Sequence, residues 1–381
     1  MNGPPPTGPA GGGGDGPPVA VRGCRVVTTS LSARLLIAEQ LRALGGIDWS
    51  VVSGDAYPDA PPHLEVHHVP MRREPALTDP VAFWRLLRLF RHHRFAFVQT
   101  HTPKASLLAL PAARLAGLTT IYTMHGCLFF RESSRRRNAA AWVFERWCCQ
   151  WADRVFLQSA EDLEVVARVR ICPPGKLRHI GNGIRLDRFP LTPPPPPRDQ
   201  PTVVMISRLV AEKGCRDFLA VARALHASAR FVLVGPADPD QRDALSAEEC
   251  REAEQRWGVE LVGGTDDVRP FLADADVVLL PSYREGMPRV AMEAAATGRP
   301  VVAYDVRGVR EVLDPATGLL VPVGDLAALT AKVAELLGDP EQRAALGRRC
   351  AAHVARYSED AVAERLRAAY RELEAAASPT R

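Results

Sequence analysis

The sequence lacks the features that mark membrane-spanning and exported proteins. It has no run of about 18 apolar residues, and its N-terminus has no charged segment followed by an apolar one. Its eight cysteines form no CxxC pair and are sparse for a chain of 381 residues. We therefore expect a cytosolic protein without a disulfide framework or an export signal.

The sequence is also poor in aromatic residues and in net charge. Aromatic residues make up 6% of the chain, the formal charge is +4, and the arginines are spread along the sequence. Nucleic-acid-binding proteins concentrate basic and aromatic side chains on one face. We therefore expect no nucleic-acid partner.

What is present is typical of a globular chain with more than one domain. The 381 residues exceed one usual domain of roughly 100 to 200 residues, and 24% of them are charged. The first 19 residues are mostly Gly, Pro and Ala, which bury too little apolar surface to offset the cost of ordering. We expect a disordered tail over residues 1–19.

Apolar, strand-like runs alternate with helix-length segments, a pattern typical of parallel β-α-β units. In the first half we expect strands over 25–29, 48–53, 95–100 and 120–123, with helices over 33–44 and 105–116. In the second half we expect strands over 202–207, 230–235, 259–262, 275–280 and 300–305, with a helix over 215–226.

A run of five prolines, Pro193 to Pro197, divides the two halves, because proline cannot supply ladder hydrogen bonds. We predict an α/β fold of two doubly wound domains, 20–190 and 201–360, joined by a linker over 191–200. An amphipathic helix over 361–381 follows. Ligands of such sheets bind beyond the carboxyl ends of the strands, so the cleft between the domains is the predicted site.

Two carboxylates follow the expected strand 275–280. Glu285 stands in the loop and Glu293 early in the next helix, whose first turn Pro288 suits. A helix N-terminus offers free N–H groups to an anion such as a diphosphate, and carboxylates accept hydrogen bonds from sugar hydroxyls. These residues therefore suit a nucleotide sugar, although two glutamates at this spacing also arise by chance on solvated helices.

Two cations follow the first strand of the second domain. Arg208 can hold phosphate through its planar fork, and Lys213 adds a compact charge, so that both could offset the charge of a departing nucleoside diphosphate. The alternative is a solvated loop in which Glu212 pairs with Lys213.

The first domain contributes three further segments. Gly181-Asn182-Gly183 permits positive φ and a close approach to ligand, or forms a plain turn. His101-Thr-Pro-Lys104 and His125-Gly126 each follow an apolar strand, on the edge facing the cleft. A histidine there can bind a sugar hydroxyl or assist proton transfer, or it can be structural. His125 is favoured because Gly126 would give a ligand room.

Together these segments resemble glycosyltransferase family 4, whose members have the GT-B fold of two facing Rossmann-like domains. The resemblance runs from about Arg25 to Tyr370. It rests on Glu285-x7-Glu293 and its continuation through Pro300, on Ser207 to Gly214, on Gly181 to Ile184, and on Gly318 to Pro322. The chain departs from many members in having Thr29-Ser30-Leu31-Ser32 where they carry a glycine pair, so we assign that loop no phosphate role.

The resemblance implies a retaining transfer of a hexose-type sugar from a nucleoside-diphosphate sugar, which we expect to be UDP-linked, without a metal or another cofactor. In the mechanism it implies, the leaving phosphate oxygen receives the acceptor proton. Arg208 and Lys213 would bind the diphosphate, Glu293 the ribose, Glu285 the transferred sugar, and His125 would lie near that sugar. The expected catalytic residues are Glu285, His125, Arg208 and Lys213. The expected substrate-binding residues are Glu293, Gly286, Met287, Pro288, Arg208, Lys213, Asn182, Gly183, His101 and Lys104.

Residues His101 to Ser106 and Tyr122 to Gly126 are most similar to the subgroup that builds capsular, exopolysaccharide and lipid-linked glycans. This implies a glycan or polyprenyl-diphosphate-linked acceptor. Arg131 and Arg135 to Arg137 precede a helix in which Val143, Trp147 and Trp151 share one face. That stripe could rest on the inner face of an anionic membrane, making the protein peripheral, or it could be core.

Other functions remain open at this stage. A nucleotide-sugar 2-epimerase of the same architecture would show several acidic residues in the first-domain cleft, and few are found there. A non-catalytic nucleotide-sugar-binding module would keep the pocket without turnover. A glycoside hydrolase is disfavoured, because its two carboxylates flank a bond from opposite sides rather than from one loop and its helix.

Overall fold

The computed structural model describes residues 21–129, 134–238, 241, 243–313 and 319–377. The expected disordered tail, Arg131, Gly318 and the last four residues of the expected C-terminal helix lie outside the described residues. Among the described residues no helix is both long and apolar enough to cross a bilayer.

The N-terminal domain is built on a seven-stranded sheet in the order β3-β2-β1-β4-β5-β6-β7. Every neighbouring pair of its strands is parallel. Its strands are β1 (Val21–Val26), β2 (Ile47–Ser53), β3 (Glu65–His68), β4 (Phe97–Thr100), β5 (Thr119–Met124), β6 (Arg154–Leu157) and β7 (Leu177–His179). Its helices are α1 (Ser30–Leu36), α2 (Ala38–Ala43), α3 (Asp79–His92), α4 (Pro103–Leu115), α5 (Arg135–Trp151), α6 (Ala160–Arg168) and the short η1 (Pro174–Lys176).

The C-terminal domain is built on a six-stranded parallel sheet in the order β10-β9-β8-β11-β12-β13. Its strands are β8 (Thr202–Ile206), β9 (Arg230–Val234), β10 (Glu260–Val262), β11 (Val277–Leu280), β12 (Val301–Tyr304) and β13 (Leu319–Val321). Its helices are η2 (Ala211–Lys213), α7 (Cys215–Leu225), α8 (Ala247–Trp257), α9 (Arg269–Asp274), α10 (Arg289–Ala296), α11 (Val309–Val312), α12 (Leu326–Gly338), α13 (Pro340–Val354) and η3 (Ala355–Tyr357).

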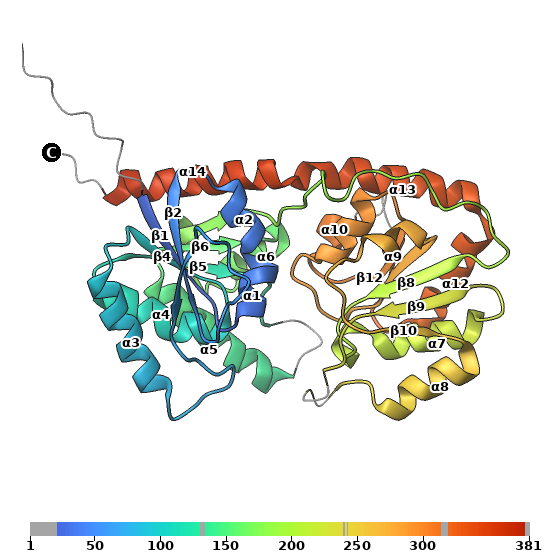
Figure 1. Ribbon diagram of the computed structural model, residues 1–381, viewed down its shortest axis with the longest axis horizontal. Helices are drawn as coiled ribbons and strands as arrows, with labels where there is room; N and C mark the ends of the chain where they lie inside the picture. The colour runs from blue at the N-terminus through green and yellow to red at the C-terminus, as the bar shows by residue number, and fades with distance from the viewer. Residues whose placement is uncertain (1–20, 130–133, 239–240, 242, 314–318, 378–381) are drawn as a thin grey trace, which may run out of the picture.

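The predicted fold class is confirmed, since both halves are doubly wound α/β sheets that stand side by side in Figure 1. The central strands are runs of Val, Leu and Ala buried on both faces, as parallel sheets covered by helices require. In each sheet the strand order reverses once, between β1 and β4 and between β8 and β11. Loops at such switch points open a crevice for ligands.

Most predicted elements differ by a few residues at their ends, and two of the differences have a local cause in the first domain. The first strand ends at Val26 rather than at Thr29, because the Thr29 side chain caps α1 by accepting a hydrogen bond from the Ser32 N–H. The helix expected over 33–44 is two short helices that meet at Ile37, whose φ of −127° leaves the helical range. Ile37 is buried in the core at this break.

The last helix, α14 (Glu359–Ala377), follows the C-terminal domain in sequence but packs on the N-terminal one (Figure 1). Its Tyr370 is buried beside Trp49 and Phe97. The Tyr370 hydroxyl donates to Gln99 Oε1 at 2.6 Å and accepts from the buried Arg25 at 3.1 Å. These contacts attach the helix to the first sheet.

The proline-rich segment 191–200 forms no helix or strand and lies between the two sheets in sequence. Its start is fixed by the buried Arg299, whose Nη2 donates to Thr192 Oγ1 at 2.7 Å and to the Pro193 carbonyl at 2.9 Å. Its end is fixed by Arg198, which pairs with Asp274 at 2.8 Å. The segment is therefore held against the C-terminal domain at both ends.

Candidate active site

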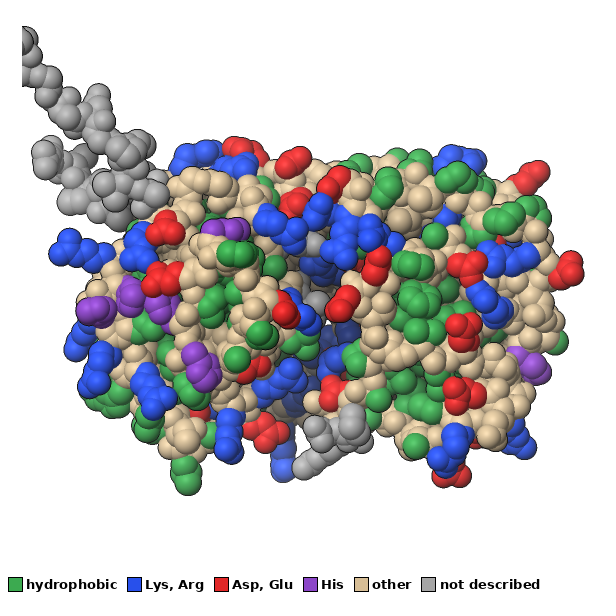
Figure 2. All heavy atoms as spheres, viewed as in Figure 1, with side chains coloured by type: hydrophobic (Ala, Val, Ile, Leu, Met, Phe, Trp, Pro, Cys, Tyr) green, Lys and Arg blue, Asp and Glu red, His purple; other side chains and the backbone are tan. Residues whose placement is uncertain are grey.

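A cleft of about 250 Å³ lies between the two domains, and both switch-point edges contribute to it. Figure 2 shows Lys and Arg side chains gathered at the hollow between the two halves. The lining residues on the N-terminal side are His101, Thr102, Pro103, Tyr122, Thr123, His125, Gly126, Cys127 and Leu128. Those on the C-terminal side are Arg208, Glu212, Lys213, Arg284, Glu285 and Gly286.

Two histidines meet on the N-terminal side. His101 follows β4 and His125 follows β5, and because these strands are parallel neighbours, their ends meet at one edge. His101 Nδ1 lies 3.0 Å from His125 Nε2, within hydrogen-bond distance. Burial lowers the pKa of His125 to about 4 and the pKa of His101 well below its usual range. Both imidazoles are therefore neutral at neutral pH.

Charged pairs occupy the C-terminal side. Lys213, in η2, lies with its Nζ 2.8 Å from Glu285 Oε1, in the loop after β11. Arg208, just after β8, pairs with Asp238 at 2.9 Å and is about half exposed. All four expected catalytic residues therefore line one cleft, with two cations and a carboxylate opposite the histidines.

The loop that carries Glu285 is fixed from several directions. Gly214 has a φ of +76°, and a Cβ there would lie 1.9 Å from the Pro281 carbonyl oxygen, so only glycine lets the Lys213 turn pack on this loop. Arg284 pairs with Glu212 at 2.8 Å. The alternative in which Glu212 pairs with Lys213 is therefore wrong, since each pairs with a residue of the loop after β11.

The Tyr283 hydroxyl connects the same loop to α7, where it shares an acceptor with Tyr304 of β12. Tyr283 and Tyr304 both donate to Asp217 Oδ2, at 2.7 and 2.8 Å. The Tyr283 N–H also donates to the Glu212 carbonyl at 3.0 Å. These partly buried contacts hold Tyr283, and with it the start of the loop, against η2 and α7.

Glycine backbones of the two domains touch beside the cleft. A Cβ on Gly286 would lie 1.8 Å from the His125 carbonyl oxygen, and a Cβ on Gly126 would lie 3.0 Å from Gly286 Cα. A Cβ on Gly308 would lie 1.5 Å from the Gly286 carbonyl oxygen. Gly126 therefore lies against the opposite domain and also lines the cleft, and the expectation that it gives a ligand room stays a prediction.

Six of the ten predicted substrate-binding residues do not line this cleft: Lys104, Glu293, Met287, Pro288, Asn182 and Gly183. Lys104 points into its own domain, where its buried Nζ pairs with Asp79 at 2.5 Å, because it is the second residue of α4 and faces the start of α3. Glu293 is the fifth residue of α10 rather than an early one, since the helix begins after Pro288. Its carboxylate is nearly buried and lies 3.7 Å from Arg289.

The other four residues lie in two segments. Asn182 and Gly183 are near the end of the first domain, and Met287 and Pro288 are in the loop between β11 and α10. Asn182 Nδ2 donates to the Met287 carbonyl at 3.2 Å, which ties the end of the first domain to the loop after β11. Gly181 has the expected positive φ, +81°, but it and Gly183 approach α14, not the cleft. Pro288 is the N-cap residue of α10. Asn182 and Gly183 instead line a smaller pocket with Arg289.

One buried acid behind the cleft has no counterpart among the predicted residues. Glu145, on α5, is fully buried and accepts a hydrogen bond from the cleft residue Tyr122 at 2.8 Å. Burial raises its pKa to about 7. The sequence around Glu145 does not predict its burial, because a glutamate in an Arg-rich helix is expected to be exposed to solvent.

Comparison with known proteins identifies both halves of the chain. Residues 30–183 match a family described as glycosyl transferase 4-like domain, and residues 200–339 match glycosyl transferases group 1. The protein EpsD of Bacillus subtilis (strain 168) is 27% identical over 79% of this chain and 83% of its own length.

A UDP-Gal:alpha-D-GlcNAc-diphosphoundecaprenol alpha-1,3-galactosyltransferase of Escherichia coli is 27% identical over 61% of this chain and 63% of its own length. Among solved structures, Anabaena HepE in complex with UDP and glucose superimposes with a TM-score of 0.77 at 17% identity. That match covers 92% of this chain and 99% of HepE, and it shows the shared fold.

Proposed function

The chain belongs to the GT-B glycosyltransferases, with a glycosyltransferase 4-like N-terminal domain and a group 1 C-terminal domain. On that premise we propose that it transfers a hexose-type sugar, with retention, from a UDP-linked donor to a glycan or lipid-linked acceptor. The observation that carries this proposal is the convergence of Arg208, Lys213 and Glu285 in one cleft.

The donor diphosphate would take the place of protein carboxylates. Arg208 and Lys213 are each held by an acid in this structure, at 2.9 and 2.8 Å. A diphosphate carries more charge and more acceptor oxygens than either carboxylate, so it can draw both cations together. Glu285, released from Lys213, is then free to accept hydrogen bonds from the hydroxyls of the sugar.

Bond cleavage in this proposal depends on the stability of the leaving group. The bond between the anomeric carbon and the phosphate oxygen breaks, and the bond to the acceptor oxygen forms on the same face. The acceptor proton passes to the leaving phosphate oxygen. Once drawn to the diphosphate, the two cations stabilise the charge as it develops, and they supply the countercharge that a divalent metal would otherwise give.

The relatives support the donor and acceptor classes in this proposal. The name of the Escherichia coli relative specifies UDP-galactose and a diphosphoundecaprenol-linked acceptor. HepE is solved with UDP and glucose. The neutral N-terminal side of the cleft suits an acceptor whose only charge is a distant diphosphate.

Membrane contact is a second proposal, favoured by exposed apolar side chains on the N-terminal domain. In the α5 stripe Val143 is 62% and Trp147 is 39% exposed, so the alternative that these two are core residues is wrong; only Trp151 packs against the core. Trp84, on α3, is 63% exposed. The helix α5 also begins with the exposed Arg135 and Arg136, and exposed apolar and basic side chains on one domain suit an anionic, cytoplasmic membrane surface.

The transfer proposal is tested by following nucleoside-diphosphate release from a panel of nucleotide sugars, with and without polyprenyl-diphosphate-linked acceptors and with EDTA present. Acceptor-dependent release from a UDP-sugar, giving a product of unchanged anomeric configuration by NMR, supports it. A changed sugar without release of the nucleoside diphosphate would indicate a nucleotide-sugar 2-epimerase. Binding of the nucleotide sugar without either reaction would indicate a non-catalytic nucleotide-sugar-binding module.

The membrane proposal has its own measurement, co-sedimentation with vesicles that contain anionic lipid. Replacing Trp84 and Val143 by Ser should weaken sedimentation, and high salt should weaken it further. Replacing the exposed Leu191, which lies on the linker, provides the matched control. Equal sedimentation of both proteins would refute membrane contact without touching the transfer proposal.

A further inference from the structure

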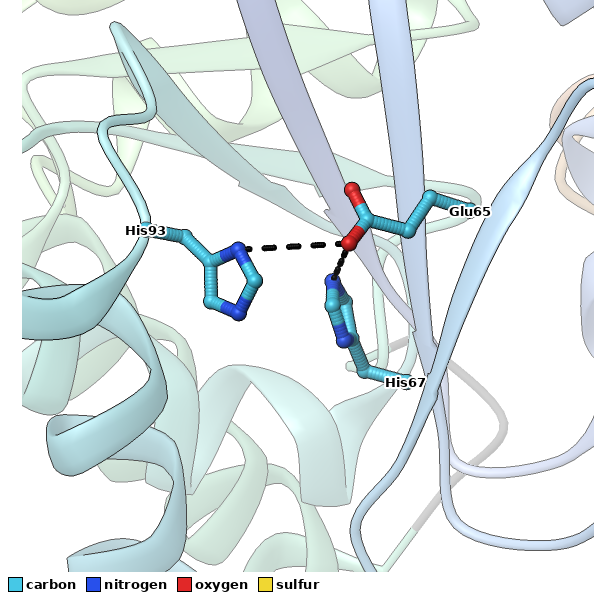
Figure 3. Close-up of side chains that lie close together, drawn as sticks. All are labelled: Glu65, His67 and His93. Atoms are coloured by element: carbon cyan, nitrogen blue, oxygen red, sulfur yellow. Dashed lines mark ion pairs between the residues drawn. The ribbon is translucent and has the colours of Figure 1, made fainter.

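Three possible metal ligands converge on the outer edge of the N-terminal sheet, away from the cleft residues. Glu65 and His67 lie on β3, the edge strand, and His93 directly follows α3. Figure 3 shows the carboxylate and the two imidazoles directed toward one another. One ligand atom from each lies within 4.8 Å of the other two.

The distances suit a small divalent ion. Glu65 Oε1 lies 3.5 Å from His67 Nε2 and 4.0 Å from His93 Nδ1. Tetrahedral Zn²⁺, with bonds of about 2.0 to 2.1 Å, separates its ligand atoms by about 3.4 Å. We propose that Glu65, His67 and His93 bind a Zn²⁺ ion, with solvent at the fourth position.

The groups around Glu65 leave its Oε1 oxygen available to bind the ion. Arg22 donates to Glu65 Oε2 at 2.6 Å and Ser50 donates to the same oxygen at 3.0 Å, so Oε1 keeps its lone pairs for the ion. Arg22 also pairs with Asp48 at 3.0 Å, so its positive charge is offset. Partners that fix an unused ligand atom in this way orient the one that binds metal.

The two imidazoles are also prepared for binding. An imidazole binds a metal ion through the lone pair of a ring nitrogen. His67 Nε2 is buried and has no hydrogen-bond partner among the described residues. His93 stacks on Phe95, with ring centroids 5.5 Å apart and planes at 13°, which holds the ring facing His67.

The ion would connect an edge strand to the segment between α3 and β4. It would stabilise the folded N-terminal domain by mass action and has no role in glycosyl transfer. The proposed site lies outside the cleft, so the expectation that glycosyl transfer needs no metal stays a prediction. The sequence signal is present, in histidines 63, 67, 68, 92 and 93, but only the fold shows which of them meet.

The test uses the full chain without a histidine tag, stripped with EDTA and titrated with Co²⁺ alone and then Zn²⁺ alone. We expect one equivalent of Co²⁺ to bind with the visible absorption of a four- or five-coordinate site, and Zn²⁺ to displace it. Zn²⁺ should also raise the unfolding temperature. Absence of saturable one-equivalent binding would overturn the proposal.

Variants separate this site from other histidines. His67→Ala and His93→Ala should each weaken Zn²⁺ binding at least ~100-fold, and Glu65→Gln, which keeps acceptors for Arg22 and Ser50, roughly 10- to 100-fold. The control is His92→Ala, next to His93 but exposed and outside the cluster. Unchanged Zn²⁺ affinity in Glu65→Gln and in a folded His67→Ala or His93→Ala variant would contradict the site. An equal loss of Zn²⁺ affinity in His92→Ala would contradict it as well.

Discussion

The two faces of the cleft differ in how they carry charge. The C-terminal face presents Arg208 and Lys213, each paired with a carboxylate. The N-terminal face presents His101 and His125, both neutral because burial lowers the pKa of each. One face is therefore suited to an anion and the other to uncharged hydroxyls.

This difference indicates how the two substrates are distinguished. The Arg208–Asp238 pair is partly exposed and exchanges partners at small cost, because solvent screens both charges. The partly buried pair of imidazoles is opened less easily, because each of the two bonded nitrogens would lose its partner. The C-terminal face should therefore reorganise when donor binds, while the N-terminal face stays as it is.

Removing the central cation of the charged face should have the largest effect. In Lys213→Ala the departing diphosphate loses one of its two countercharges, and we expect turnover to fall roughly 1,000-fold with folding unchanged. Glu285→Ala should also abolish turnover. Nucleoside-diphosphate release under saturating donor measures both.

Lys332→Ala is the matched control, because Lys332 also pairs with a glutamate, at 2.9 Å, but on the exposed surface of α12. Its rate should equal that of the unmodified protein. Normal rates in Lys213→Ala and Glu285→Ala would show that the charged face is not the donor site.

Separating the faces should have the next largest effect. In Gly286→Ala the new Cβ would lie 1.8 Å from the His125 carbonyl oxygen, so the faces must move apart by more than 1 Å. A displacement of that size costs about 100-fold in rate. Gly263→Ala, where no atom lies within 4 Å of the new Cβ, is the control. Equal rates for the two variants would mean that catalysis does not need this closed contact.

On both faces, the sequence could predict the residues that stand at the ends of strands. Two alternating sheets and their strand ends follow from apolar periodicity, and so the residues that directly follow a strand, His101, His125 and Arg208, are found in the cleft. Lys213 belongs to the Ser207 to Gly214 motif and Glu285 to the Glu285-x7-Glu293 motif. The resemblance of both motifs to the family predicts the same place, in the cleft.

Residues that lie within a helix could not be placed in this way. Lys104 stands only three positions after His101, yet helix geometry turns it toward Asp79. Glu293 is turned toward Arg289 for the same reason. Pairings between distant segments, such as Glu212 with Arg284, depend on tertiary packing, which a local pattern does not encode.

A buried acid behind the neutral face gives a pH-dependent test. Burial raises the pKa of Glu145 from 4.5 to about 7, so its protonated form stabilises the fold below pH 4.5, and this contribution is lost as pH rises through 7. Glu145→Gln imitates the protonated form. Relative to the unmodified protein, its free energy of unfolding should rise by on the order of 3 kcal/mol between pH 5 and pH 8. Urea unfolding at both values measures this, and a difference independent of pH would show that Glu145 is ionised in the fold.

The smallest expected effect comes from loosening one ion pair of the charged face. Asp238 holds Arg208 at 2.9 Å, and Arg208 must leave it to reach a diphosphate. Asp238→Asn keeps the shape but removes the charge, so donor binding no longer competes with an exposed pair worth up to about 1 kcal/mol. The KM for donor should fall by roughly 2- to 5-fold with kcat unchanged, whereas Asp267→Asn, which breaks an exposed pair with Arg269 outside the cleft, should change neither. A KM that rises in Asp238→Asn would mean that the carboxylate positions Arg208 for the donor instead of competing with it.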